Sequence, residues 1–238
     1  MKKPRFVDNQ IYHIYNRGVE KRKIFLDNQD YLRFVHDLFE FNDTKPAENL
    51  YYKKAILQSY EVQPRKIGKR GVTRFQRELL VNILIFCLMP NHFHLLLRQK
   101  RENGIIKFMQ KLGTGYTMYF NQKYERVGTL FQGRFRAVLV AQEPHFVHLP
   151  YYIHLNPLDL IEPRWREGKI EDYQRVIEFL ESYRWSSFLD YIGKKNFPSL
   201  TQRKFLLNLF KGEKEYKKET IRWLKEIDLE KIRSTILE

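Results

Sequence analysis

The sequence is poor in the residues that form covalent cross-links or thiolate sites. It has a single cysteine, Cys87, among 238 residues. One cysteine excludes an intramolecular disulfide and a metal cluster held by several thiolates. No apolar run reaches the roughly 20 residues of a membrane-spanning helix, and no apolar segment follows the charged start MKKPRFVDNQ. We therefore expect a cytoplasmic protein that does not bind membranes.

Positive charge, by contrast, is abundant. Lys and Arg number 43 against 28 Asp and Glu, which gives a formal net charge of +15. Residues 98–136 hold nine basic and two acidic side chains, whereas the tail 211–238 is close to neutral. A basic field of this size favours polyanions, most often nucleic acid. The alternative is a basic surface that only aids solubility.

The hydrophobic pattern alternates between strands and helices. It predicts, in chain order, a strand at 10–18, a helix at 28–42, paired strands at 79–89 and 92–99 and a helix at 103–126. Residues 128–140 then lead into another strand, and the segment that begins at Glu143 is helical in its second half until Asn156-Pro157. This order is typical of a ferredoxin-like α+β fold, in which helices cover one antiparallel sheet. A helical C-terminal extension follows.

Several local features qualify this pattern. Asn28 is the expected N-cap of the first helix, and Gly113 and Gly115 weaken the second. Residues 43–78 are basic and broken by glycine, and they predict an insertion. The amphipathic end of the tail 196–238 most simply packs against the protein's own body. A dimer contact or a DNA-reading module is the alternative for the tail.

The segment LMPNHFHLLL carries the most specific chemical signal. Pro90-Asn91 predicts a turn between two antiparallel strands. Because side chains alternate along a strand, His92 and His94 project from the same face. The strand is too apolar for a sheet edge, so we expect it to be central. Two imidazoles on one buried face are either half of a metal site or a hydrogen-bonded structural pair.

The helix with the sequence YYIHLNP is the best candidate to cover the two histidines. Tyr152 and Asn156 are four residues apart and share a helix face, with His148 one turn earlier. Two imidazoles and an amide oxygen would leave coordination positions open for substrate oxygens. A tyrosine beside them can attack a phosphodiester covalently. No carboxylate lies nearby in sequence to activate water, which favours attack by tyrosine over hydrolysis.

Simpler interpretations exist for each of these residues. Tyr151 and Tyr152 can both be core residues of an amphipathic helix, and we favour that interpretation for Tyr151. Asn156-Pro157 can be a helix stop without a ligand role.

Five blocks in this order make the chain resemble a known family: YHIYNRG, CLMPNHFHLLL, YFNQKYERVGTLFQGRF, YYIHLNP and YRWSSF. The sequence resembles the single-tyrosine HUH transposases, which are IS200-like, and within them the REP-associated tyrosine transposases. The resemblance covers roughly residues 8–192. It implies one transposase domain over 1–192, including the insertion, and a helical extension over 193–238.

The resemblance also implies an activity: a transposase-type endonuclease and strand-transferase that cuts and rejoins single-stranded DNA at or near hairpins. It assigns the nucleophile that forms a 5′-phosphotyrosine to Tyr152, and the ligands of Mg²⁺ or Mn²⁺ to His92, His94 and Asn156. Two alternatives remain open at this point. One is a catalytically silent protein that binds DNA or RNA hairpins, and the other is a metal-dependent phosphodiesterase that uses water.

Three arginines are candidates for DNA binding. Arg134 and Arg136 are two residues apart, so on a strand they would share a face and could grip phosphate through their guanidinium groups. Arg17, after the first strand, is a weaker candidate. A homodimer is possible, and the sequence does not decide it.

Overall fold

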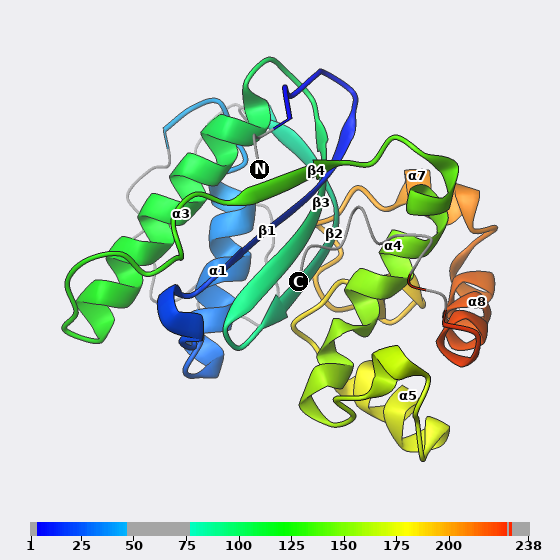
Figure 1. Cartoon of the computed structure of the whole chain (residues 1–238). Coiled ribbons are helices and arrows are strands. Elements are labelled where there is room, and N and C mark those ends of the chain that lie inside the picture. The colour runs from blue at the N-terminus through cyan, green and yellow to red at the C-terminus, as the bar shows by residue number, and fades with distance from the viewer. Residues whose placement is uncertain (1–3, 47–76, 228, 230–238) are drawn as a thin grey trace, which may run out of the picture.

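The computed structural model describes residues 4–46, 77–227 and 229 (Figure 1). Four strands form one sheet in the order β2-β3-β1-β4, with every neighbouring pair antiparallel. The strands are β1 (Ile11–Arg17), β2 (Val81–Met89), β3 (His92–Gln99) and β4 (Arg136–Leu139). The histidine-bearing β3 lies between β2 and β1, so its predicted central position is confirmed.

Helices cover both faces of this sheet (Figure 1). One face packs against α1 (Asn28–Glu40) and α3 (Gly104–Lys123). The other packs against α4 (Glu143–Leu155) and the helical segments after it. These segments are η3 (Asn156–Leu160), η4 (Trp165–Glu167), α5 (Tyr173–Ser182), α6 (Phe188–Tyr191), α7 (Lys204–Leu209) and α8 (Glu213–Lys225), and a short η1 (Val19–Lys21) follows β1. The order β1-α1-β2-β3-α3-β4 confirms the predicted ferredoxin-like α+β fold.

The alternation of side chains along β3 places the histidines on the α4 face. Phe93, Leu95 and Leu97 are buried against α1 and α3, so His92 and His94 must project to the opposite face. The two strands of the β2-β3 hairpin are joined by Pro90-Asn91, and Met89 pairs directly with His92. The predicted hairpin is therefore confirmed.

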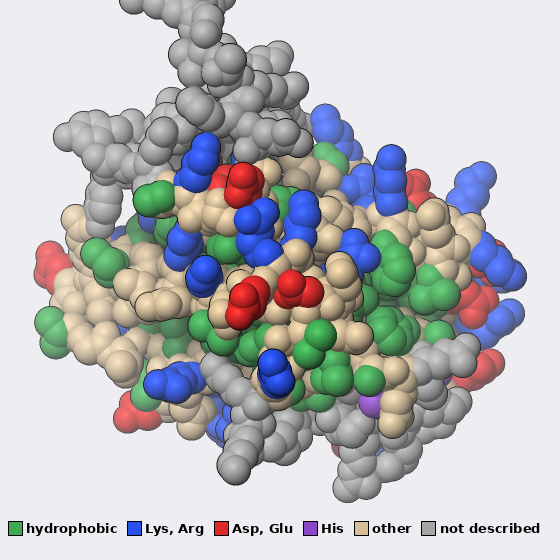
Figure 2. Space-filling model, turned by 90° about the horizontal axis from the view of Figure 1, so that it is seen from above, with side chains coloured by type: hydrophobic (Ala, Val, Ile, Leu, Met, Phe, Trp, Pro, Cys, Tyr) green, Lys and Arg blue, Asp and Glu red, His purple; other side chains and the backbone are tan. Residues whose placement is uncertain are grey.

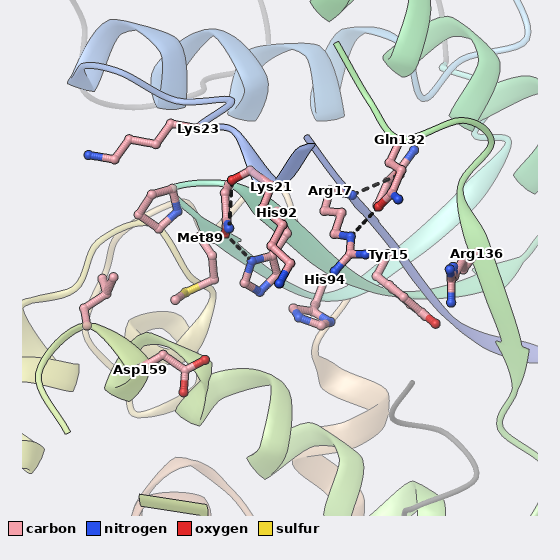
Figure 3. A pocket seen from close by; sticks show the side chains of 14 residues that line it. Tyr15, Arg17, Lys21, Lys23, Met89, His92, His94, Gln132, Arg136 and Asp159 are labelled. Atoms are coloured by element: carbon pink, nitrogen blue, oxygen red, sulfur yellow. Dashed lines mark hydrogen bonds between the residues drawn. The ribbon is translucent and has the colours of Figure 1, made fainter. Parts of the chain in front are cut away.

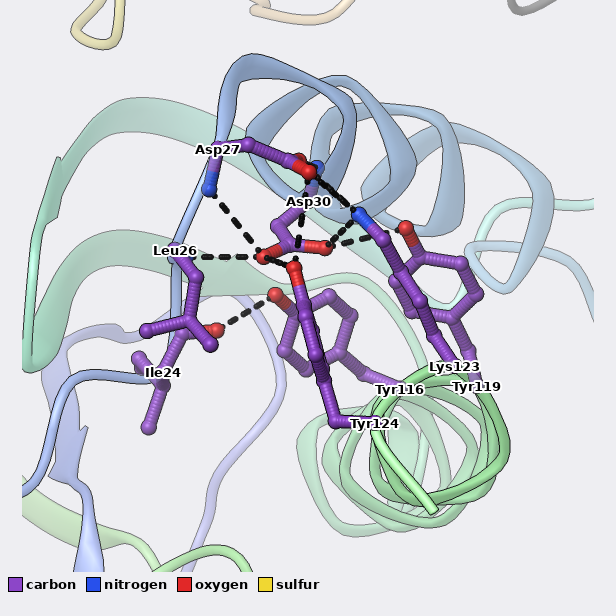
Figure 4. Close-up of polar contacts among 8 residues, drawn as sticks. All are labelled: Ile24, Leu26, Asp27, Asp30, Tyr116, Tyr119, Lys123 and Tyr124. Atoms are coloured by element: carbon purple, nitrogen blue, oxygen red, sulfur yellow. Dashed lines mark hydrogen bonds and ion pairs between the residues drawn. The ribbon is translucent and has the colours of Figure 1, made fainter.

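The beginning of α1 is fixed to the end of α3 by a polar cluster (Figure 4). Asp27, not the predicted Asn28, is the N-cap, because its carboxylate accepts from the backbone N–H of Asp30 at 3.0 Å. Buried Asp30 in turn accepts hydrogen bonds from α3 and the residue after it, namely from Lys123, Tyr119 and Tyr124. Burial opposes the charge of Lys123, but the hydrogen bonds to Asp27 and Asp30 prevail and raise its pKa.

Helix α3 is continuous through both of its central glycines. A Cβ atom at Gly115 would lie 2.5 Å from Cζ of Phe41, so the close packing of α3 on that ring requires glycine. No atom lies within 4 Å of the corresponding position at Gly113. Packing therefore requires a glycine at position 115, whereas position 113 has room for a larger side chain.

The C-terminal helices pack onto α4. Tyr216, Trp223 and Leu224 of α8 are buried in the same core as Tyr151 of α4. Among the apolar residues of the amphipathic end, Leu224 is buried in this core, and Ile227 and Leu229 pack against it. For these three residues, packing against the protein's own body is confirmed. The division into domains at residues 192 and 193 stays a prediction.

Most of the predicted insertion, residues 47–76, lies outside the described residues. Its two ends meet, since the Thr44 N–H donates to the Glu78 carbonyl at 3.0 Å. Within the described chain, no helix combines the length and apolar character that crossing a membrane requires.

Candidate active site

His92 and His94 lie side by side on β3, with ring centroids 5.0 Å apart and ring planes nearly perpendicular (Figure 3). Each ring uses its Nδ1 atom in a hydrogen bond. His92 Nδ1 lies 2.7 Å from Oδ1 of Asn91, and His94 Nδ1 lies 2.9 Å from Nε2 of His13. Both Nε2 atoms are buried and have no hydrogen-bond partner among the described residues. Two buried nitrogens without partners are the arrangement that a metal ion would satisfy.

The surroundings keep both imidazoles neutral. Burial lowers the pKa of His92 to about 4; Asp159 opposes this shift, and Arg166 and Arg17 add to it. Burial also lowers the pKa of His94 well below its usual value, with further contributions from His92 and His13. A neutral imidazole has one ring nitrogen with a free lone pair, which is the form that binds metals.

Helix α4 brings Tyr152 to the histidines. The ring centroid of Tyr152 lies 6.2 Å from that of His94, with the ring planes at 85°. Tyr152 is only 1% exposed. Tyr151 faces the other way, against Phe210, Tyr216 and Trp223. This geometry favours Tyr152 over its neighbour as the residue that can reach the site.

Asn156 is fully buried at the end of α4, and its side chain has two partners. Its Nδ2 donates to the backbone carbonyl of Tyr152 at 2.8 Å, and its Oδ1 accepts from Nη2 of Arg166 at 3.1 Å. One lone pair of the amide oxygen is therefore used by an arginine, and the ligand role of Asn156 stays a prediction. His148 does not join this group, because its ring lies 6.3 Å from that of Trp223 on α8.

Arg166 and Asp159 are two site residues that the sequence did not reveal. The guanidinium of Arg166 lies 5.5 Å from the ring centroid of Tyr152, and it also pairs with Asp159. Asp159 accepts a second hydrogen bond from Trp165 Nε1 at 2.6 Å. It lines the same cavity as the histidines. The expectation that no carboxylate is close to the site is therefore wrong, since η3 turns Asp159 toward the cavity three residues after Asn156.

The described residues nevertheless contain no cluster of three or more His, Cys, Asp or Glu side chains that could hold a metal ion. Any ion bound here would have the two histidines as its main protein ligands. The remaining positions would belong to an amide oxygen, water or a substrate.

The cavity in front of the histidines is basic. It has a volume of about 690 Å³, and its positively charged lining residues are Arg17, Lys21, Lys23 and Arg136. The Arg17 Nε donates to Oε1 of Gln132 at 2.5 Å, which orients the guanidinium along the cavity wall (Figure 3). On the one face that Figure 2 shows, Lys and Arg side chains lie at several places, with Asp and Glu side chains among them. The cavity therefore holds basic side chains next to the histidine pair, an arrangement that suits a phosphate-bearing ligand.

Arg134 and Arg136 do not share a face, contrary to the sequence prediction. Strand β4 begins at Arg136, which lines the histidine cavity. Arg134 lies before the strand, in the bend after Gly133, and lines a different cavity beside α3. The prediction was wrong because it extended the regular alternation of a strand through a turn.

Fold and site together define a class of protein: a ferredoxin-like domain that places a histidine pair beneath a helix-borne tyrosine. Residues 51–156 match the family model of the IS200-like transposases. The matched segment includes His92, His94, Tyr152 and Asn156 and ends at the last of them. This match confirms, for residues 51–156, the family resemblance seen in the sequence motifs.

A solved structure of a REP-associated tyrosine transposase bound to a REP hairpin is similar to the chain at 10% sequence identity. The similarity covers 83% of this chain and 88% of that one, with a TM-score of 0.46. No curated protein matches the sequence significantly.

Proposed function

We propose that this protein is a single-tyrosine endonuclease and strand-transferase that cuts and rejoins single-stranded DNA at or near hairpins. The main support is the pair of buried Nε2 atoms of His92 and His94, which have no hydrogen-bond partner among the described residues, together with the contact between the rings of His94 and Tyr152. The transposase family model matched by residues 51–156 supports DNA as the substrate. The hairpin preference rests on the resemblance of the sequence motifs.

The residues fit a divalent cation, Mg²⁺ or Mn²⁺. His92 and His94 would hold it through Nε2, and Asn156 would contribute its amide oxygen. Bound there, the ion would withdraw charge from a phosphodiester oxygen. Arg17 and Arg136, which line the same cavity, would hold the phosphate backbone by hydrogen bonds.

In the proposed reaction, the Tyr152 oxygen attacks the phosphorus and the bond from phosphorus to the 3′ oxygen breaks. The phenol gives up its proton to water in the cavity, and the departing oxygen takes up a proton to become a 3′-hydroxyl. The phosphate remains joined to the tyrosine and to the 5′ oxygen of the downstream segment of the cut strand, so each bond formed has a bond broken to match it.

All of the proposed groups belong to one chain. Tyr152 lies beside the histidines of its own sheet, so the chemistry does not require a tyrosine from a second copy. A homodimer would be compatible with this arrangement, but it is not needed for it.

Asp159 favours a second candidate, a metal-dependent phosphodiesterase that uses water. Its carboxylate lines the histidine cavity and could take a proton from an attacking water. The covalent route stays the first proposal because the carboxylate already pairs with Arg166 and Trp165.

The two candidates are separated by a denaturing gel of labelled single-stranded hairpins incubated with protein and Mn²⁺. The proposal predicts an adduct that survives denaturation, is lost in Tyr152→Phe and in His92→Ala, and is kept in Tyr151→Phe. Cleavage without an adduct would favour hydrolysis. Tight binding with neither product would favour a protein that binds hairpins without cutting them.

A further inference from the structure

A third histidine, His13, reaches the proposed metal site from the neighbouring strand. β1 pairs with β3 so that Tyr15 lies opposite His94, and His13 lies two residues before Tyr15 on the same face. The His13 and His94 rings are stacked, with centroids 5.1 Å apart and planes 20° apart. His13 is 1% exposed, so its hydrogen bond to His94 is shielded from water.

One proton lies between His13 Nε2 and His94 Nδ1, and its position decides what His94 can do. If His13 donates, a neutral His94 carries its own proton on Nε2 and has no lone pair there for a metal ion. If His94 donates from Nδ1, its Nε2 lone pair is free. Only the second arrangement makes His94 a ligand.

His92, the other proposed ligand, shows how the chain can fix the tautomer of a histidine. The Asn91 Nδ2 donates to the Lys21 carbonyl at 3.3 Å, which orients the amide with its oxygen toward His92. An amide oxygen can only accept, so His92 must donate from Nδ1 and keep Nε2 unprotonated.

A bound cation would favour the same arrangement at His94. Its Nε2 is buried and has no hydrogen-bond partner among the described residues, so a proton or a lone pair there is unsatisfied while no ion is bound. A lone pair becomes satisfied when a cation binds, whereas a proton on that nitrogen would block the cation.

We propose that His13 is a positioning residue that accepts a hydrogen bond at Nε2 from His94 Nδ1 and thereby presents His94 Nε2 to a divalent cation. His13 does not touch the ion or the substrate. It fixes the tautomer and ring orientation of His94, as Asn91 does for His92. This inference rests on the metal site of the proposed function.

The tautomers can be determined in the unmodified, metal-free protein. Long-range ¹H–¹⁵N correlation spectra of the imidazoles near neutral pH distinguish a protonated Nδ1 from a protonated Nε2. The inference predicts protonated Nδ1 in His92 and His94, and an unprotonated Nε2 in His13. A proton on His94 Nε2 would overturn it.

Metal affinity provides a second test, with Mn²⁺ alone as the probe and calorimetry as the readout. Loss of a hydrogen-bond partner behind a ligating histidine weakens metal binding by about 10–100-fold, and we expect this for His13→Phe. His13→Gln places an amide near the same position and should recover much of the affinity. The control His36→Phe, on α1 and outside the site, should bind as the wild type does.

The outcomes separate the inference from the proposed function. Binding that is lost in His94→Ala but unchanged in His13→Phe would overturn the role of His13 and leave the metal site intact. Wild-type protein that binds no Mn²⁺, or binds it equally well as His94→Ala, would overturn the metal site and the inference with it. Thermal unfolding of each variant shows whether it is folded, and the spectra of the unmodified protein do not depend on any variant.

Discussion

The substitution Tyr216→Phe tests whether the C-terminal helix holds the proposed nucleophile in place. His154 lies between Tyr152 and Asn156 and is fully buried. Its Nδ1 is 2.6 Å from the Tyr216 hydroxyl of α8, and its Nε2 is 2.8 Å from Oγ of Ser187, which also accepts from a β2 amide. This network connects α4, α8 and the sheet.

The expected loss follows from burial. Without the hydroxyl, Nδ1 of His154 lacks a partner in a site that water does not reach, at a cost of about 1–3 kcal/mol. For a chain of this size, each kcal/mol lowers Tm by about 2–4 °C. A displacement of about 1 Å at an attacking group can cost on the order of 100-fold in rate. We therefore expect adduct formation to slow by about 10-fold or more at temperatures where the variant is folded.

Urea unfolding measures the loss of stability, and the adduct gel measures the rate of adduct formation. Tyr173→Phe is the matched control, because this half-buried tyrosine has no hydrogen bond within the described structure. Removing its hydroxyl should change neither the stability nor the rate of adduct formation. A Tyr216→Phe protein as stable as the wild type would refute the structural reasoning. A destabilised variant with an unchanged adduct rate would refute the positioning of α4 by α8.

Three further predictions concern packing, charge and pH. Gly115→Ala should lower the free energy of unfolding by about 1–3 kcal/mol, since its Cβ would meet an aromatic ring at 2.5 Å; Gly113→Ala, with open space, should raise it by up to about 1 kcal/mol. Both are measured by urea denaturation. Arg136→Gln should weaken binding of single-stranded DNA and reduce its salt dependence by about one phosphate contact; Arg134→Gln should have a smaller effect at this site, as fluorescence anisotropy at several salt concentrations would show. His92 has a pKa of about 4 in the folded protein and about 6.5 when unfolded, so the unfolded chain binds the proton first as the pH falls. Stability should drop between these two values, and the drop in urea midpoints should be shallower in His92→Gln.

The fold was predictable because its strands and helices have clear periodicities. The apolar run before Pro90-Asn91 and the alternation after it predicted a hairpin with a central strand, and the structure has both. Strand register and helix caps were harder to predict from the sequence. The N-cap of α1 is Asp27 rather than the predicted Asn28, because the reciprocal hydrogen bonds with Asp30 favour the earlier residue.

The site was predictable where its residues are local in sequence. His92 and His94 share a strand, and Tyr152 and Asn156 are one helical turn apart, so periodicity placed each pair on one face. Whether the four bind metal and cut DNA stays a proposal. The contact between His13 and His94 spans 81 positions, and it depends on the β1-β3 register, which no single segment encodes.

Arg166 and Asp159 were missed for a related reason. Both follow the end of α4, where short 3₁₀ turns bring the chain back beneath the cavity. Neither helical nor strand periodicity applies there. An acidic residue three positions after Asn156 was the one available sign, since it falls within the next turn of the chain.

The most direct test of the account is the identity of the residue that becomes linked to DNA. After reaction with a single-stranded hairpin and Mn²⁺, digestion with trypsin and mass spectrometry would locate the nucleotide on the peptide between Arg136 and Arg164. The account predicts fragment ions that assign a phosphodiester-linked nucleotide to Tyr152. Assignment to Tyr151, or cleaved DNA with no modified tyrosine, would contradict it.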